Sequence, residues 1–218
     1  MKNDIHFWMA TLVRGALALI VGSAVIVIPD MATTLLLLPF ALAISILCLA
    51  SYGVLDSTIV FITSFMASSR TARIALLLQG TFGIIVGILL LSIAFDRVQF
   101  DWFLYLIGIQ ALCVALAEFV VARHALTHGT SIWNYAAAFV ALLFMAAYFI
   151  AAATSRESLA PREVAWLIFG YLVAFGMAQC LTAARMLYSD RQVSAKNTPP
   201  HADRKHVTPI TDGTDREQ

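Results

Sequence analysis

A few polar side chains interrupt long apolar stretches of this sequence and are its first candidates for chemistry. They are Arg14, Asp56, Gln79, Glu118 and Gln179. A guanidinium can form an ion pair with a carboxylate, and an amide can donate a hydrogen bond to one. Because an isolated charge inside a bilayer costs free energy, charged residues at that depth are usually paired or functional. We therefore treat these five residues as candidate intramembrane polar contacts.

Their positions predict two contacts between helices, Arg14 with Asp56 and Gln79 with Glu118. In each pair, a long donor side chain and an acidic side chain have similar depths from the same membrane face. Gln179 has a comparable depth in the last apolar stretch. A structural contact is the favoured interpretation. The alternatives are that Arg14 extends alone to the membrane surface, as long basic side chains do, and that these residues handle a proton or a solute.

The histidines do not form a metal-binding pattern. They fall in expected loops and termini, at His6, His124, His128, His201 and His206. His124 and His128 could share a helix face, but no HExxH motif and no third ligand accompanies them. A solvated loop is the preferred interpretation, with acid sensing as the alternative, because histidine titrates at about pH 6.5. We predict no bound metal.

The sequence contains no catalytic or cofactor-binding motif. Cys48, Cys113 and Cys180 lie within apolar stretches and lack CxxC or Cys/His spacing, which indicates small buried side chains. There is no G-x-S-x-G motif, P-loop or dinucleotide-binding fingerprint. We therefore expect a non-enzymatic protein with no catalytic residues and no cofactor.

The composition indicates which elements must position these residues. Hydrophobic residues make up 61% of the 218 residues and charged residues only 12%, which is too apolar for a soluble core coated with polar surface. A membrane-crossing helix needs about 20 apolar residues. Six stretches qualify: Trp8–Ile28, Met31–Leu55, Ile74–Phe95, Trp102–Ala122, Ile132–Ala153 and Val164–Ala184. Spanning strands are about half as long and alternate apolar with polar residues.

We therefore predict an all-α integral membrane protein with six transmembrane helices in three repeated hairpins. Its main partner is then the lipid bilayer. The net charge of +1 gives no reason to expect a nucleic-acid partner.

Polar and proline-containing segments separate the predicted helices. Pro29 and Asp30 are predicted to end the first helix, because proline lacks an amide donor and disfavours helical geometry just before it. Charged residues around Asp96 separate the third and fourth helices, and residues 155–163 separate the fifth and sixth. After the second helix, residues 57–69 remain apolar, so this helix either continues or lies along the membrane surface.

The predicted membrane domain covers residues 1–188, with hairpins at about 8–56, 74–122 and 132–185. Residues 189–218 are polar and proline-containing, which predicts a disordered tail. Lys and Arg accumulate on the side of the two chain ends, whereas the basic residues of the other side each have an acidic neighbour. Because basic residues favour the cytoplasmic side, we predict that both termini and the tail are cytoplasmic.

The first and third predicted helices share a Gly-x2-small-x3-Gly pattern. At a constant offset of 65 residues, Gly15, Ala18 and Gly22 match Gly80, Gly83 and Gly87. The same offset brings Leu47 and Cys48 onto Leu112 and Cys113, which indicates a duplicated hairpin. The third hairpin keeps only part of the pattern. Since lipid tails are as apolar as leucine, small residues act by letting helix backbones approach closely, and we assign these six residues to helix packing.

One set of residues carries a family resemblance. Arg14-Gly15, Gly22 and Pro29-Asp30, with a second helix that ends Tyr52-Gly-Val-Leu-Asp56-Ser57, resemble the repeat of the HdeD-like bacterial membrane proteins. The resemblance covers roughly residues 7–188. Asp30, where the family usually has glycine, and the third hairpin depart from it. The resemblance implies six spans, an inner-membrane location and an association with acid resistance, but it supplies no catalytic residues.

From the residues and the resemblance, we expect a non-enzymatic inner-membrane protein. It would contribute to acid or stress tolerance through the bilayer, other membrane proteins or further copies of itself. The alternative is a small oligomeric transporter or channel for protons or a small solute. The apolar middle of the predicted helices speaks against a proton relay across the bilayer.

Overall fold

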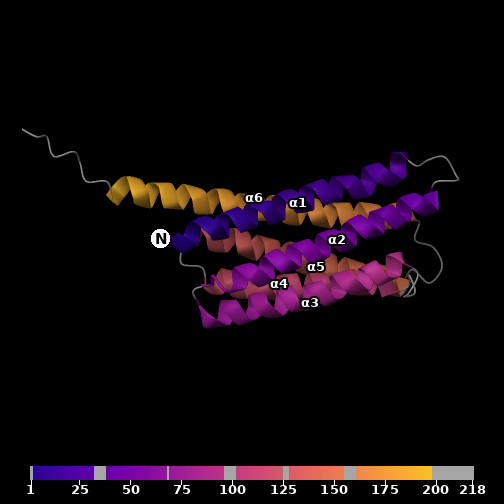
Figure 1. Cartoon of the computed structure of the whole chain (residues 1–218), viewed down its shortest axis with the longest axis horizontal. Helices are drawn as coiled ribbons and strands as arrows, with labels where there is room; N and C mark the ends of the chain where they lie inside the picture. Colours follow the sequence, from indigo (N-terminus) through magenta and orange to yellow (C-terminus); the bar gives the residue numbers. More distant parts are fainter. Residues whose placement is uncertain are drawn as a thin grey trace, which may run out of the picture.

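The computed structural model describes residues 2–31, 38–67, 69–95, 102–124, 128–154 and 161–197. They form six α-helices and no strand: α1 Lys2–Met31, α2 Leu38–Ser64, α3 Arg70–Ala94, α4 Phe103–His124, α5 His128–Thr154 and α6 Pro161–Asn197. All six are long and apolar enough to cross a membrane. The predicted all-α fold with six membrane-spanning helices is therefore confirmed. Figure 1 shows them side by side along the long axis of the molecule.

The first two helices differ from their predicted boundaries. α1 continues past Pro29 to Met31, so the proline lies in its last turn. α2 begins at Leu38, not at Met31 as predicted, and residues 32–37 lie outside the described residues. Pro39 is the second residue of α2, where a backbone N–H has no acceptor within the helix, so a proline there removes no hydrogen bond.

The ambiguous segment after the second predicted span is helical. α2 continues through the apolar residues up to Ser64, and its membrane-spanning part is Ala43–Ser64. The next helix starts soon afterwards, because Ser69 is its N-cap and accepts a hydrogen bond from the backbone N–H of Ala72 at 3.0 Å. This shift places Asp56 inside the span, whereas the sequence had suggested the end of the second helix.

α6 is longer than expected. It continues to Asn197, so the prediction that the disordered tail begins at residue 189 is wrong for residues 189–197. No glycine or proline stands between Gly176 and Pro199, and nothing in the sequence therefore interrupts the helix as it becomes polar. Residues 198–218, the rest of the predicted tail, lie outside the described residues, as do 96–101 and 155–160 of the predicted breaks. Residues 161–163, assigned to the last predicted break, form the start of α6 instead.

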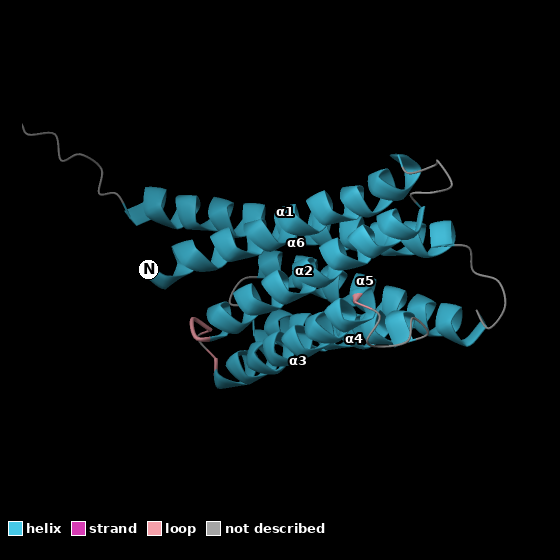
Figure 2. Ribbon diagram, turned by 45° about the vertical axis from the view of Figure 1, so that its right-hand side comes forward, coloured by secondary structure: helices cyan, strands magenta, loops and turns pink. Residues whose placement is uncertain are grey.

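The helices form a closed ring. Each helix packs against the next one in the chain, and α6 packs against α1. The most extensive contacts are α2 with α3, α4 with α5, and α6 with α1, which join one predicted hairpin to the next. Figure 2 shows the same lengthwise bundle from a second direction. The start of α1 and the end of α6 lie at one end of it, which we call the terminus side; the opposite end is the far side.

The small residues of α1 pack against α6. A Cβ added to Gly15 would stand 2.8 Å from the carbonyl oxygen of Gly176, and one added to Gly22 would stand 3.0 Å from Cβ of Leu172. Ala18, between these glycines, is completely buried. The backbones of α1 and α6 therefore approach at a distance that larger side chains would prevent.

The glycines of α3 make the corresponding contact with α2. A Cβ on Gly80 would stand 2.9 Å from Cα of Phe61, and one on Gly87 would stand 2.6 Å from Cγ2 of Val54. Gly83 faces the side chain of Ser57 so closely that no Cβ fits. In both helices, the small-residue face thus lies against the preceding helix of the ring rather than against its own hairpin partner.

Outside this packed interior, the helices expose large apolar side chains. Ile20 is 65% exposed on α1, and Phe139 is 64% exposed on α5. Such a surface is unfavourable in water and favourable against lipid tails. The protein is accordingly a multi-pass membrane protein whose outer faces contact the bilayer.

Candidate intramembrane polar site

Arg14 contacts carboxylates from two other helices. Its Nε donates a hydrogen bond to Oδ1 of Asp56 on α2 at 2.7 Å, and its Nη2 donates to Oδ2 of the same residue at 3.3 Å. Its Nη1 donates to Oε1 of Glu118 on α4 at 3.4 Å. Only 8% of the Arg14 side chain is exposed, so it does not extend alone to the membrane surface. The bidentate contact with Asp56 also fixes the orientation of the guanidinium.

Gln179 brings a fourth helix to this point. Its Nε2 on α6 donates a hydrogen bond to Oε1 of Glu118 at 2.8 Å. We refer to Arg14, Asp56, Glu118 and Gln179 as the Arg14 centre. All four are buried. Their contacts join α1, α2, α4 and α6, including the pairs α1–α4 and α4–α6, which are not neighbours in the ring.

The charged members of the Arg14 centre lie well inside the membrane-spanning segments. Arg14 follows Phe7 by seven residues, Asp56 precedes Ser64 by eight and Glu118 precedes His124 by six. With a rise of 1.5 Å per residue, these positions are about 9 to 12 Å from the terminus-side ends of their segments. That is roughly one third of a hydrocarbon layer about 30 Å thick. At this depth, each charge depends on its partners for stabilisation.

Residues of α6 also position the guanidinium. Phe175 and Gln179 are four residues apart and therefore share one helix face. The Cζ atom of Arg14 lies 5.7 Å from the centre of the Phe175 ring, a distance at which a cation is attracted to an aromatic face. The close approach of Gly15 to Gly176 holds α1 against this face.

The predicted contact between Gln79 and Glu118 is wrong. Gln79 is buried, but neither its Nε2 nor its Oε1 has a hydrogen-bond partner among the described residues. Glu118 instead accepts from Arg14 and Gln179. Equal depth therefore did not suffice for contact, because depth does not specify the direction in which a side chain leaves its helix.

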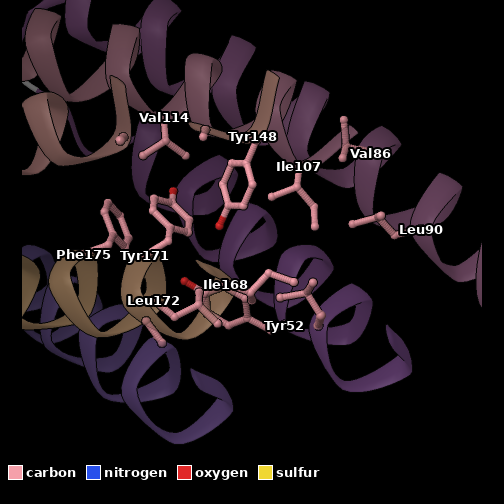
Figure 3. Packing of buried hydrophobic residues seen from close by; sticks show 14 of the residues in the cluster. Tyr52, Val86, Leu90, Ile107, Val114, Tyr148, Ile168, Tyr171, Leu172 and Phe175 are labelled. Carbon is pink, nitrogen blue, oxygen red and sulfur yellow. The ribbon is translucent and has the colours of Figure 1, made fainter. Parts of the chain in front are cut away.

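A group of tyrosines next to the Arg14 centre was not among the candidate residues. Tyr52, Tyr148 and Tyr171 come from α2, α5 and α6 and are buried. The rings of Tyr148 and Tyr171 meet edge to face, with 6.1 Å between their centres, and the ring of Tyr171 stacks on Phe175. Figure 3 shows Tyr148 and Tyr171 side by side in the interior, with Phe175 beyond Tyr171. One sequence signal pointed to this group, since Tyr52 and Asp56 are four residues apart and share a helix face.

A small cavity lies on the terminus side of the Arg14 centre. It has a volume of about 20 Å³, enough for about one water molecule, and both Arg14 and Glu118 line it. Thr11, Thr63 and Thr182 line it as well, and we call it the threonine cavity. Each of these hydroxyls donates a hydrogen bond to a backbone carbonyl of its own helix. The oxygen atoms of the hydroxyls remain as acceptors beside the cavity.

A larger cavity lies on the other side of the Arg14 centre. It has a volume of about 50 Å³ and is lined by Asp56, Gln110 and the three tyrosines, so we call it the tyrosine cavity. The Nε2 of Gln110 donates to Oγ of Ser57 at 3.5 Å, but its Oε1 has no partner among the described residues. The hydroxyl of Tyr148 also has none there. The middle of the bundle is therefore less apolar than the sequence had suggested.

The Arg14 centre carries an excess of acidic groups. Arg14 contributes one formal positive charge, whereas Asp56 and Glu118 contribute two negative charges. When all three are ionised, the formal sum is −1. This arrangement can hold helices together, and it can also attract a proton or another cation to its two adjoining cavities.

His124 and His128, whose spacing would have allowed a shared helix face, lie on different helices. His124 is the last residue of α4 and is exposed, whereas His128 is the first residue of α5. Cys48, Cys113 and Cys180 are half-buried free cysteines on α2, α4 and α6. Within the part of the chain that the structure describes, no three His, Cys, Asp or Glu residues are grouped to hold a metal ion.

Three comparisons with known proteins found no match. No protein-family model matches the chain, no curated protein matches its sequence and no solved structure matches its fold.

Proposed function

We propose that this chain is a non-enzymatic membrane protein of the HdeD-like type. In this proposal it resides in a bacterial inner membrane, with both termini in the cytoplasm, and contributes to acid or stress tolerance. The resemblance at Arg14-Gly15, Gly22 and Tyr52 to Ser57 supports the family. The accumulation of Lys and Arg on the side of the two chain ends supports the orientation.

The observation that carries a non-enzymatic role is that the polar groups of the Arg14 centre bind one another. The carboxylates of Asp56 and Glu118 bind the guanidinium of Arg14, and the amide of Gln179 binds Glu118. Because these side chains bind one another, their main role is to hold α1, α2, α4 and α6 in one arrangement. That arrangement presents apolar outer faces to lipid and to other membrane proteins.

Survival of acid shock tests the physiological part of the proposal. We expect a deletion strain to survive less well than its parent, and the wild-type protein to restore survival. Arg14→Ala should restore it less well, whereas Arg73→Ala, at an exposed position of α3, serves as the matched control. Equal survival of the deletion strain and its parent would remove the proposed role in acid tolerance. The amount of each variant in the membrane fraction shows whether reduced survival results from lost function or from a lower protein level.

The orientation has its own test. A reporter that is active only in the cytoplasm, fused after Gln218, should be active. The same reporter inserted between Asp96 and Asp101 should be inactive. The opposite pattern would reverse the proposed topology.

A second candidate function is the transport of protons or a small solute by an oligomer. The placement of a cavity on each side of the buried acidic excess favours it. Purified protein in liposomes should then produce a flux that Glu118→Gln abolishes, while Gln79→Met leaves it intact. Liposomes with wild-type protein that are no leakier than empty ones would exclude this candidate.

A further inference from the structure

Two unpartnered polar atoms border the tyrosine cavity. The hydroxyl of Tyr148 and the Oε1 of Gln110 are buried and have no hydrogen-bond partner within the described part of the chain. Tyr148 is itself completely buried, and its ring points into the interior next to Tyr171 (Figure 3). Because a buried polar atom without a partner is unfavourable, an occupant that binds these two oxygens stabilises the folded protein.

The charge beside the cavity restricts the type of occupant. Asp56 belongs both to the Arg14 centre and to the cavity wall, so the formal charge of −1 that the centre has when Arg14, Asp56 and Glu118 are ionised lies next to the cavity. In the low-dielectric interior, such an excess favours a single positive counter-charge and disfavours an anion. The oxygen of Gln110 is an acceptor only, which also suits a cation.

The three tyrosines and the size of the cavity agree with a small cation, while the rest of the wall is apolar. Aromatic ring faces attract cations, and Tyr52, Tyr148 and Tyr171 are among the residues that line the space. A volume of about 50 Å³ is sufficient for a small ion with a few water molecules. A bulky organic cation does not fit.

We propose that the tyrosine cavity is a binding site for a small monovalent cation. Its ligands are the carboxylate of Asp56, the Oε1 of Gln110 and the hydroxyl oxygen of Tyr148, while the Tyr148 O–H donates a hydrogen bond to a water of the bound ion. This site is independent of the proposed role in acid tolerance. It requires binding, but neither transport nor a stress response.

Thermal unfolding of the full chain in detergent tests the proposal. Ammonium, sodium and potassium chloride are titrated at constant ionic strength against the bulky cation N-methylglucamine. A ligand that binds only the folded state raises the unfolding temperature in a saturable way. We expect saturation with at least one of the three small cations and none with N-methylglucamine. Identical curves for all four salts would overturn the proposal.

Three variants localise the effect. Tyr148→Phe keeps the ring and removes one ligand, so the half-saturating concentration should rise about tenfold, equivalent to the loss of a single good hydrogen bond. Glu118→Gln makes the formal charge of the centre zero and should abolish the effect. Tyr105→Phe is the matched control, since Tyr105 contacts Trp102 and Phe149 and does not line the cavity.

The same measurements distinguish a bound cation from a proton or water in the cavity. An unchanged cation response in Glu118→Gln would show that the acidic excess does not recruit the ion, and the proposal would fail. A wild-type protein insensitive to all small cations would mean that a proton or water alone occupies this region, and the proposal would fail as well. Neither result would bear on survival of acid shock.

Discussion

Around Arg14, four helices meet through charged and amide side chains, and two of these contacts join helices that are not neighbours in the ring, whereas α2 and α3 pack along the glycines of α3. The first set of contacts depends on which atoms face each other, and those of Glu118 span the interior of the ring. The second runs between adjacent helices and depends on backbone shape, as the positions of Gly80 and Gly87 illustrate. In lipid, where apolar surfaces gain little by associating, the protein joins non-adjacent helices through polar contacts of Glu118, and adjacent helices through the Arg14–Asp56 pair or through close packing.

The two contacts should respond differently to substitution. Removing one member of a buried charged group leaves the others without compensation, which is more unfavourable than the lost contact itself. Adding an atom to a glycine contact instead forces two backbones apart. The following substitutions compare these effects in decreasing order of expected size.

The largest loss is expected for Arg14→Ala. It leaves the carboxylates of Asp56 and Glu118 buried without a cation, and the free energy of unfolding should fall by about 3 to 5 kcal/mol. Reversible unfolding in mixed detergent measures this value. Arg73→Ala removes the same side chain at an exposed position and should change it by less than about 0.5 kcal/mol. Similar values for both variants would contradict a stabilising role of the Arg14 centre.

An intermediate loss is expected for Gly80→Ala. The new Cβ would meet the Phe61 backbone at 2.9 Å, so α2 and α3 must separate slightly, at a cost of about 2 kcal/mol. Gly53→Ala is the control, because its new Cβ would come no closer than 3.9 Å, to Cα of Gly87. The same unfolding measurement applies. A Gly80 variant as stable as the Gly53 variant would show that the glycine contact tolerates a methyl group.

A smaller loss is expected for Gln179→Met, which keeps the size of the side chain but removes the donor to Glu118. The free energy of unfolding should fall by about 1.5 kcal/mol, as for other hydrogen bonds to charged groups. Combining it with Glu118→Gln should give less than the sum of the two single effects, because the residues are in contact. Strict additivity would indicate that the contact contributes nothing.

The smallest effect is expected for Gln79→Met. Both amide atoms of Gln79 lack a partner among the described residues, so replacing the amide removes no contact and relieves an unfavourable burial. Stability should stay within about 0.5 kcal/mol of the wild type or increase. A loss as large as that of Gln179→Met would show that Gln79 has a partner, such as a bound water molecule.

The number of membrane-spanning helices among the described residues and the contact of Arg14 with Asp56 could both be predicted from the sequence alone. Long apolar stretches indicate spans, and few charges were present inside them to be paired. The failure of Gln79 to reach Glu118 and the presence of the tyrosine cavity could not be predicted, because both depend on helix rotation and on the neighbours in the ring. Tyr148 gave no signal of its own, since a tyrosine within an apolar helix resembles the surrounding core.

The contact of α6 with α1 has a consequence for biosynthesis. The glycine face of α1 is translated before its neighbour α6, with the four helices α2 to α5 between them in the chain. Before α6 is made, Asp56 on α2 is the first partner available to Arg14 in the nascent chain. α1 can therefore pack against α6 only after translation has passed Gly176, and chains truncated earlier should be recognised by membrane quality control.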